Sequence, residues 1–375
     1  MIVTVTLNAA IDRTLLVPNF QLGQRHRASE GTSSAGGKGI NVARAARRLG
    51  VPVVCTGLAG GRTGTLLVEE LTNEGILNDF VRIRGESRTS TAVLDPTSNV
   101  YTEINEWGPE VSEDELDVLR EKLAYLSQGA AYVVFAGSLP RDVDPGLYAE
   151  LIREGNRRGL MTVLDSEGEA LRLGIEAEPY LVAPNLREAE SLVGHEFVDA
   201  EDLTSALDEI ADLGARNVLI TLDTGCYGLF REERAENIRI RARAPRLEAV
   251  STVGAGDTLL AGFIAARMND RSYEDAVRSS VAASAASVLE AGPGRFDFRE
   301  AQRLGSHVTL DRLAGSPGRL SGPRPVRGRL VGSLDGRRDR PREEGAAGLR
   351  LRRHRDRPQP PHPRSGRRGH WLETG

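Results

Sequence analysis

Lysine is nearly absent from this chain of 375 residues, which contains 2 Lys against 47 Arg. Cysteine is equally scarce, and Cys55 and Cys226 lie too far apart in sequence to suggest a metal knuckle or a disulfide framework. No apolar run approaches the roughly 20 residues that a membrane-spanning helix needs. The first residues, MIVTVTLNAA, have no basic segment before their apolar stretch and predict a strand, not a secretion signal. We therefore expect a cytoplasmic enzyme or binding protein with no membrane partner.

The charge of the chain changes sign near its end. The whole chain has a net charge of −4, yet the segment from residue 316 onward has 16 Arg, no Lys and only 6 acidic residues. This segment is also poor in large apolar side chains, so it cannot bury enough surface to offset the entropy of ordering. We expect residues 1–310 to form one globular domain and residues 311–375 to be a disordered tail. The tail is either a frameshift product or a basic arm, and its single aromatic residue, Trp371, makes nucleic-acid binding an unfavoured interpretation.

Short apolar, β-branched runs alternate with helical patterns through most of the domain. The runs are IVTVTL, VPVVCTG, AYVVFAG, LMTVLD, YLVAPN and NVLITL. Repeated strand–helix alternation predicts a mostly parallel sheet that is covered by helices on both faces, a three-layer α/β/α fold. Ligands of such sheets bind at the carboxyl ends of the strands. Polar residues follow several of these runs, among them Asn8, Ser138 and Asn185, so this edge is the predicted site.

Two segments break the alternation. Residues 13–30 and 88–106 are typical of extended strands with turn residues between them. A few strands cannot form a core of their own, so we expect a small sheet that lies over the site as a lid or against a partner chain.

The segment VSTVGAGDTLLAGF, residues 250–263, places two glycines and an acid directly before an apolar helix. Amides in the first turn of a helix have no internal partner and attract anions. Asp257 could accept a proton there from a hydroxyl that attacks a phosphoryl group. The alternative is that Asp257 only caps the helix.

Two further segments carry candidate site residues. In SSAGGKGINVARAARRLG, residues 33–50, Gly36 and Gly37 would let the backbone close on a sugar while Asn41 reaches a hydroxyl. The alternative is a glycine-rich turn with an exposed Lys38. In APNLREAE, residues 183–190, Asn185 and Glu188 could organise hydrated Mg²⁺. Their spacing alone favours a capping box, and both roles can hold together.

These segments, in this order, resemble the ribokinase-like (phosphofructokinase-B type) family of carbohydrate kinases, and within it the branch of 1-phosphofructokinase and tagatose-6-phosphate kinase. The resemblance covers about residues 1–304 and rests on TLNAAID, AGGKGINVARAARRLG, TEINEWGPEVS, AGSLP, APNLREAE and STVGAGDTLLAGF. It implies the ribokinase-like fold with a small β-sheet lid.

The resemblance also implies roles for individual residues. Asp257 would be the general base, and the anion hole would be formed by the amides of Gly254, Ala255, Gly256 and Asp257. Sugar hydroxyls would be held by Asp12, Gly37 and Asn41, with Ser138 close by. The phosphate already on the sugar would be bound by Arg25, Arg27 and Arg88. The nucleotide would contact Asn185, Thr221, Gly254 and Gly256. Mg²⁺ would be held through water by Glu188 and Asn185.

The implied activity is an ATP-dependent kinase that converts a ketohexose phosphate to the bisphosphate, with fructose 1-phosphate the favoured substrate. Tagatose 6-phosphate and fructose 6-phosphate are alternatives, and a homodimer through the lid is implied. The chain departs from the family at Ala183, where a Lys is common, and at Asp223 and Cys226, where glycines are expected. A sugar-phosphate-binding regulator on a degenerate kinase scaffold is therefore the alternative of another class.

Overall fold

A mixed sheet forms the centre of the fold. The structure, a computed structural model, describes residues 1–98, 100–231 and 236–314, and in these residues eleven strands belong to this sheet. Ten of them follow the spatial order β15-β14-β13-β12-β11-β10-β9-β1-β4-β5, and β6 pairs with β4. The strands are β1 (Ile2–Thr6), β4 (Val53–Gly60), β5 (Leu77–Asn78), β6 (Val81–Ile83), β9 (Tyr132–Ala136), β10 (Met161–Asp165), β11 (Leu181–Val182), β12 (Asn217–Leu222), β13 (Gly225–Phe230), β14 (Ile238–Arg243) and β15 (Thr309–Arg312).

The sheet is parallel from β12 to β5 and antiparallel from β12 to β15. All six strands expected from the apolar runs are present, so the predicted α/β fold with a mostly parallel sheet is confirmed. β15 continues past residue 310, where we expected the domain to end, and the amide of Leu313 still donates to the carbonyl of Arg239. The expected tail lies almost wholly outside the described residues.

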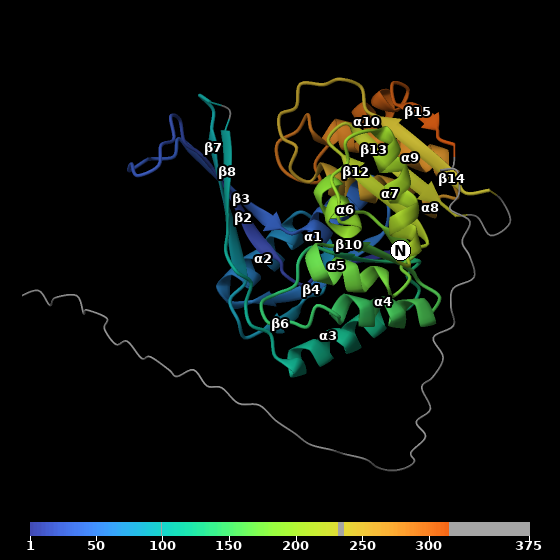
Figure 1. Ribbon diagram of the computed structural model, residues 1–375. Coiled ribbons are helices and arrows are strands. Elements are labelled where there is room, and N and C mark those ends of the chain that lie inside the picture. Colours follow the sequence, from blue (N-terminus) through green and yellow to red (C-terminus); the bar gives the residue numbers. More distant parts are fainter. Residues whose placement is uncertain (99, 232–235, 315–375) are drawn as a thin grey trace, which may run out of the picture. The chain divides into compact units, whose positions relative to one another are not determined.

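Helices cover both faces of the central sheet (Figure 1). One layer consists of α1 (Lys38–Arg48), α2 (Gly61–Asn73), α8 (Ala255–Met268), α9 (Tyr273–Ser287) and α10 (Phe298–Gly305). The other consists of α3 (Glu113–Leu126), α4 (Leu147–Arg157), α5 (Gly168–Ile175), α6 (Leu186–Val193) and α7 (Ala200–Asp212). Along β9, Tyr132 and Val134 pack into the first layer while Val133 and Phe135 pack into the second, as the two-residue period of a strand requires. None of the described helices is long and apolar enough to cross a membrane.

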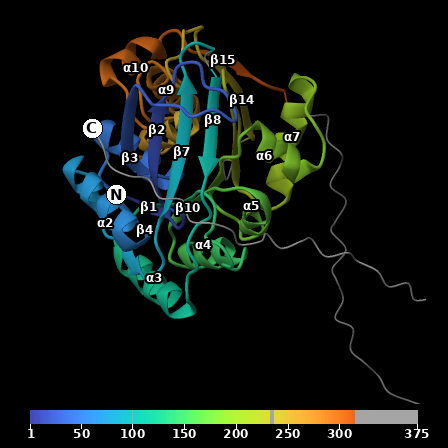
Figure 2. The same ribbon diagram turned by 90° about the vertical axis from the view of Figure 1, so that its left-hand side faces the viewer.

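A second sheet, which we call the lid, projects from one side of the domain (Figures 1 and 2). Its strand order is β3-β2-β7-β8, with β2 (Ala10–Leu16), β3 (Glu30–Gly36), β7 (Arg88–Asp95) and β8 (Val100–Asn105). The predicted small sheet is therefore present, but its first hairpin differs from the expected extent. The strands lie at residues 10–16 and 30–36, and residues 17–29 are the loop between them, where Pro18, Gly23 and polar residues leave no alternating apolar pattern.

Candidate active site

A cleft with a volume of about 990 Å³ lies where the parallel strands of the central sheet end. It is lined by residues that are far apart in sequence, including Lys38, Asp165, Asn185, Glu188, Thr221 and Gly254–Asp257. Its size suits a nucleotide-sized ligand, because ligand pockets span roughly 300–1,000 Å³. Asp165 ends β10 and Asn185 follows β11, so the site lies at the edge that the alternation of strands and helices predicts.

Asp257 lies in the first turn of α8 and is only 7% exposed. Burial raises the pKa of its carboxyl group to about 7; the charges of Asp165 and Glu188 add to the rise, while Lys38 and a hydrogen bond from Asn41 oppose it. A carboxyl group with this pKa can take up a proton near neutral pH, as a general base must. Desolvation is thus the main cause of its tuned proton affinity.

Asp257 does not cap α8. The N-cap is Gly254, with φ of 76°, and no side chain makes a capping hydrogen bond. A Cβ at Gly254 would lie 2.6 Å from the Cβ of Pro293, so both the backbone angle and the close packing require glycine. The interpretation of Asp257 as a simple cap is therefore wrong.

The first amides of α8 are open to the cleft. The amide of Ala255 donates to the carbonyl of Thr252, but those of Gly256 and Asp257 have no acceptor in the part of the chain that the structure describes. Unsatisfied amides at the positive end of a helix dipole bind anions. The cleft therefore combines an anion-binding helix start with a carboxylate of raised pKa.

Lys38 connects two carboxylates at the floor of the cleft. Its ammonium nitrogen lies 2.8 Å from Oδ1 of Asp165 and 3.1 Å from Oε1 of Glu188. Burial alone would lower the pKa of Lys38, but these negative charges outweigh it and the pKa is raised. The lysine is hence permanently charged and held beside Asp257. The alternative of a glycine-rich turn with an exposed Lys38 does not hold.

Asn185 and Glu188 form a capping box at the start of α6, as their spacing favours. The amide of Glu188 donates to Oδ1 of Asn185 over 3.0 Å, and the amide of Asn185 donates to Oε2 of Glu188 over 2.8 Å. Thr221 lies next to them, because Asn185 and Thr221 form an isolated parallel bridge. The fold thus brings these three predicted residues together.

The donor set of the cleft fits Mg²⁺ bound mainly through a nucleotide. No group of three or more His, Cys, Asp or Glu among the described residues could hold a metal by itself. Mg²⁺ is usually bound by one or two carboxylates together with substrate phosphates and water. Glu188 supplies such a carboxylate, and its oxygens keep lone pairs beyond those that accept from Lys38 and Asn185.

Asp12 lies on β2 of the lid. Burial raises the pKa of Asp12 to about 6, and the nearby Glu103 adds to the rise, while Arg88 and Arg44 oppose it. A Cβ at Gly36 would lie 2.1 Å from the carboxyl group of Asp12, so a larger residue there would displace this side chain. The next residue, Gly37, is the N-cap of α1.

Arg88 begins β7, paired with Ala10 of β2. Its Nε donates to the carbonyl of Asn8 over 3.2 Å, and its Nη1 donates to Oδ1 of Asn105 over 3.3 Å. Nδ2 of Asn8 also donates to Oγ of Ser138 over 3.1 Å. Arg88 and Ser138 are therefore connected through Asn8, although neither lines the large cleft.

Arg25 and Arg27 do not join the other predicted residues within one chain. Both are exposed in the loop between β2 and β3. Asp12 lies four residues from the end of β2 at Leu16, which is about 13 Å along a strand. These two arginines are thus at the far end of the lid hairpin from Asp12.

Asn41 is bound inside the protein. Its Nδ2 donates to Oδ2 of Asp257 over 2.8 Å, and its Oδ1 accepts from Nη1 of Arg44 over 3.1 Å. Asn41 is 6% exposed and Arg44 is 3% exposed. The sequence patterns do not single out Arg44, Glu74 or Asp165 as site residues. Asp165 nevertheless carries a usable signal, because it is a polar residue at the end of a predicted strand.

Asp223 and Cys226, where the family pattern has glycines, lie in and next to a short turn. Leu222 pairs with Gly225 and Thr221 pairs with Cys226, so Asp223 and Thr224 form a two-residue hairpin loop. Cys226 is fully buried in β13, where burial raises the pKa of its thiol to about 12. Asp223 and Thr224 still line the cleft, and Ala183 lines it close by.

Comparison with known proteins places the chain among sugar kinases. The protein is 32% identical to the 1-phosphofructokinase of Borreliella burgdorferi over 314 residues, which cover 84% of this chain and 99% of that protein. The phosphofructokinase-2 of Escherichia coli, solved in complex with substrates and products, matches with a TM-score of 0.74 at 30% identity over 82% of this chain and 98% of its own. The ribokinase of Arabidopsis thaliana shares the fold, with a TM-score of 0.63 at 23% identity, and the match covers 81% of this chain and 98% of that one.

The family match covers most of the described residues. Residues 3–298 correspond to the pfkB family carbohydrate kinase. This range includes both sheets of the fold except Ile2 of β1 and the whole of β15, and it contains Lys38, Asp165, Glu188 and Asp257. Together with the ribokinase-like fold and the cleft, this match shows that the chain belongs to the pfkB family of carbohydrate kinases.

Proposed function

We propose that this protein transfers the γ-phosphoryl group of ATP to fructose 1-phosphate, which gives fructose 1,6-bisphosphate and ADP. The observation that carries the proposal is the buried Asp257 beside the free amides of Gly256 and Asp257 in a cleft of nucleotide size. Relatives that span almost the whole domain are named 1-phosphofructokinase, which favours this acceptor. We place the activity in the cytoplasm, where ATP and sugar phosphates are available.

Asp257 acts as the general base. Its Oδ1 makes no hydrogen bond within the described residues and is left to accept the proton of the attacking hydroxyl. As the proton moves to Asp257, the acceptor oxygen forms a bond to the γ-phosphorus, and the bond to the β–γ bridging oxygen breaks. The amides of Gly256 and Asp257, and the fixed charge of Lys38, stabilise the negative charge on the transferring group.

The nucleotide lies along the cleft with its phosphates toward the start of α8. Asn185 and Thr221 contact it from the ends of β11 and β12, and Gly254 and Gly256 let its phosphates approach the backbone. Mg²⁺ would be held through water by Glu188 and Asn185, and it would neutralise charge on the phosphates.

The sugar lies between the lid and the start of α1. Asp12, Gly37 and Asn41 hold its hydroxyls, with Ser138 near it, and Arg88 binds the phosphate that it already carries. A planar guanidinium group can donate two hydrogen bonds to phosphate oxygens. Asn41 already bonds Asp257 through Nδ2, so any contact with the sugar uses its remaining hydrogen-bonding capacity.

We propose that two chains associate through the lid. On β8, Val100 and Ile104 are 53% and 60% exposed and lie on the same face of the sheet, where a second lid can cover them. Arg25 and Arg27 would then bind the sugar phosphate of the second chain, since they lie too far from Asp12 of their own. Closure of the lid keeps water away from ATP.

Tagatose 6-phosphate and fructose 6-phosphate remain alternative acceptors. A regulator that binds sugar phosphate without turnover is a candidate of another class, and the altered residues Ala183 and Asp223 in the cleft favour it. The buried carboxylate of Asp257 argues for catalysis instead, because binding a sugar phosphate requires no group that accepts a proton.

The test is ADP release with Mg·ATP and each of four acceptors: fructose 1-phosphate, tagatose 6-phosphate, fructose 6-phosphate and free fructose. Turnover should be confined to a phosphorylated ketose and fall by at least roughly a hundredfold in Asp257→Asn, which is the scale of a lost general base. The matched control is Asp297→Asn, because Asp297 caps α10 through the amides of Arg299 and Glu300 and does not line the cleft.

The outcomes separate the alternatives. Full activity in Asp257→Asn would refute the assigned base, and a preference for free fructose would refute the role of the lid arginines. Binding of a sugar phosphate without turnover of any acceptor would favour the regulator.

A further inference from the structure

A buried guanidinium group stands directly behind the proposed base. The side chain of Arg44, on α1, is only 4% exposed. Each of its five N–H groups has an acceptor: Nε and Nη2 reach the carboxylate of Glu74 over 2.6 and 3.0 Å, Nη2 reaches the carbonyl of Ala35 over 2.8 Å, and Nη1 reaches Oδ1 of Asn41 over 3.1 Å and the carbonyl of Pro293 over 3.3 Å. A fully used fork of this kind is rigid.

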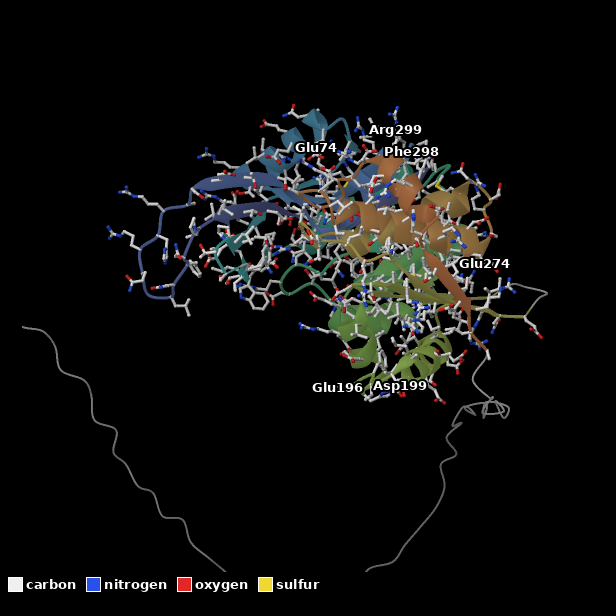
Figure 3. All side chains as sticks on the ribbon, turned by 90° about the horizontal axis from the view of Figure 1, so that it is seen from above. Glu74, Glu196, Asp199, Glu274, Phe298 and Arg299 are labelled. Atoms are coloured by element: carbon white, nitrogen blue, oxygen red, sulfur yellow. The ribbon has the colours of Figure 1, made fainter. Side chains whose placement is uncertain are left out.

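Glu74 anchors this guanidinium group from the end of α2, where it is the C-cap residue. Figure 3 shows Glu74 near the blue helix α2, with orange C-terminal elements beside it. The Glu74 carboxylate also lies 4.0 Å from Arg295, in the segment that follows Pro293. The hydrogen bond to Arg44 lowers the pKa of Glu74 although burial opposes it, so the anchor stays charged.

Arg44 decides how the amide of Asn41 is turned. A guanidinium group has only donors, so the atom of Asn41 that faces it must be the carbonyl oxygen. The NH₂ group of Asn41 is therefore turned toward Asp257, where it donates to Oδ2. We propose that Arg44, anchored by Glu74, is a positioning residue that fixes, through the Asn41 amide, which oxygen of Asp257 is left to face the acceptor hydroxyl.

The same guanidinium group holds the segment behind the anion-binding helix start. Pro293, whose carbonyl accepts from Arg44, packs against Gly254 at the N-cap of α8. The hydrogen bond from Arg44 to the carbonyl of Ala35 fixes the chain next to Gly36, and Asp12 lies against Gly36. Arg44 thus links the base, the free amides of α8 and the root of the lid.

The proposal has a consequence for the ionisation of Asp257. Donation from Asn41 stabilises the ionised carboxylate and lowers the pKa of Asp257 against the effect of burial. The other charged groups that face Asp257 are Asp165 at the end of β10, Lys38 on α1 and Glu188 on α6. None of them contacts Arg44, so a change at Arg44 reaches Asp257 mainly through Asn41.

The test is the titration of the Asp257 carboxyl group in the full chain, followed by ¹³C NMR of labelled Asp and assigned with Asp257→Asn. Arg44→Met should raise the midpoint by about one pH unit, because the charge-stabilising hydrogen bond loses its fixed geometry. Asn41→Leu should raise it by a similar amount, and the double variant Arg44→Met/Asn41→Leu should raise it no further than Asn41→Leu alone.

The matched control is Arg48→Met. Arg48 lies one turn further along α1 and donates to the carbonyl of Phe296, but it has no bond to Asn41. Its removal should leave the midpoint unchanged. Glu74→Gln keeps Arg44 in place with a weaker anchor, so it should raise the midpoint of the Asp257 titration by a smaller amount than Arg44→Met. It serves as the test in case Arg44→Met does not fold.

An Arg44→Met effect of equal size with and without the Asn41 side chain would overturn the proposal, as would no effect in folded Arg44→Met or Glu74→Gln. The assignment of Asp257 as a base rests on the proposed function, but the titration needs no substrate. Absence of turnover in the parent protein would refute the proposed kinase activity, but it would not affect the proposed link from Arg44 through Asn41 to Asp257. With turnover present, kcat of Arg44→Met should fall about tenfold at pH 7, and the acidic limb of its pH profile should move upward with the midpoint.

Discussion

Replacing the proposed base should make the protein more stable. In Asp257→Asn, Asn41 can still donate to the side-chain oxygen at position 257, and Lys38 keeps both of its remaining partners. What disappears is the cost of ionising a buried carboxyl group, whose pKa is raised from 3.8 to about 7.

The sign and the size follow from linkage. Because the folded pKa of Asp257 is raised, ionisation of this group lowers the stability of the parent as the pH rises from about 4 to about 7, and the Asn variant lacks this contribution. The difference between 3.8 and 7 corresponds to about 4 kcal/mol at pH 8 and about 1 kcal/mol at pH 4.5.

The assay is urea unfolding of the parent and Asp257→Asn at pH 4.5 and pH 8, with turnover measured on the same samples. The variant should unfold at a higher urea concentration at pH 8, and the gap should narrow at pH 4.5. Asp297→Asn is the control, because Asn is as good a cap as Asp and should leave both midpoints near those of the parent. An Asp257→Asn protein that is less stable than the parent at pH 8 would refute the reasoning.

Three further changes test other parts of the site. Arg88→Ala should raise KM for the sugar phosphate at least about tenfold with a smaller effect on kcat, since a charged hydrogen bond to phosphate is lost; an unchanged KM would remove Arg88 from the sugar site. Glu188→Gln keeps a side chain that suits the capping box, and should raise the Mg²⁺ concentration for half-maximal turnover about tenfold; unaltered Mg²⁺ dependence would contradict the assigned role. Ile104→Lys should convert a dimer to a monomer in sedimentation and weaken sugar binding, whereas a mass equal to that of the parent would exclude association through this face.

Much of the fold follows from local pattern. The apolar runs predict the six central strands because strands buried on both faces are continuous β-branched segments, and the glycines before Asp257 mark the start of a helix. The expected lid segment of residues 13–30 contains both strand and loop, because Pro18 and Gly23 mark a turn but do not fix the residue at which each strand ends. The sequence also places Lys38 in its motif but does not reveal its partners, Asp165 and Glu188, which come from two other elements.

The inner support of the site could not be predicted in this way. Arg44 lies on α1 among surface-type arginines such as Arg47 and Arg48, and Glu74 is an ordinary acid at the end of a helix. Arg44 gains its five acceptors only because the fold brings Glu74, Ala35 and Pro293 to it from distant parts of the chain, beside Asn41 on its own helix. Contacts of this kind depend on tertiary structure and leave no periodic signal.

The ladder between β2 and β7 joins two strands that lie far apart in sequence. It pairs Ala10 with Arg88 and Leu16 with Leu94, and the chain between these strands includes α1, β4 and α2. Closing so long a loop is entropically costly until the intervening elements are in place, and strand pairs of high sequence separation form slowly. We therefore expect the lid to fold last and to exchange its amide hydrogens first. The ability to bind the sugar phosphate would then be the last property gained in folding and the first one lost in unfolding.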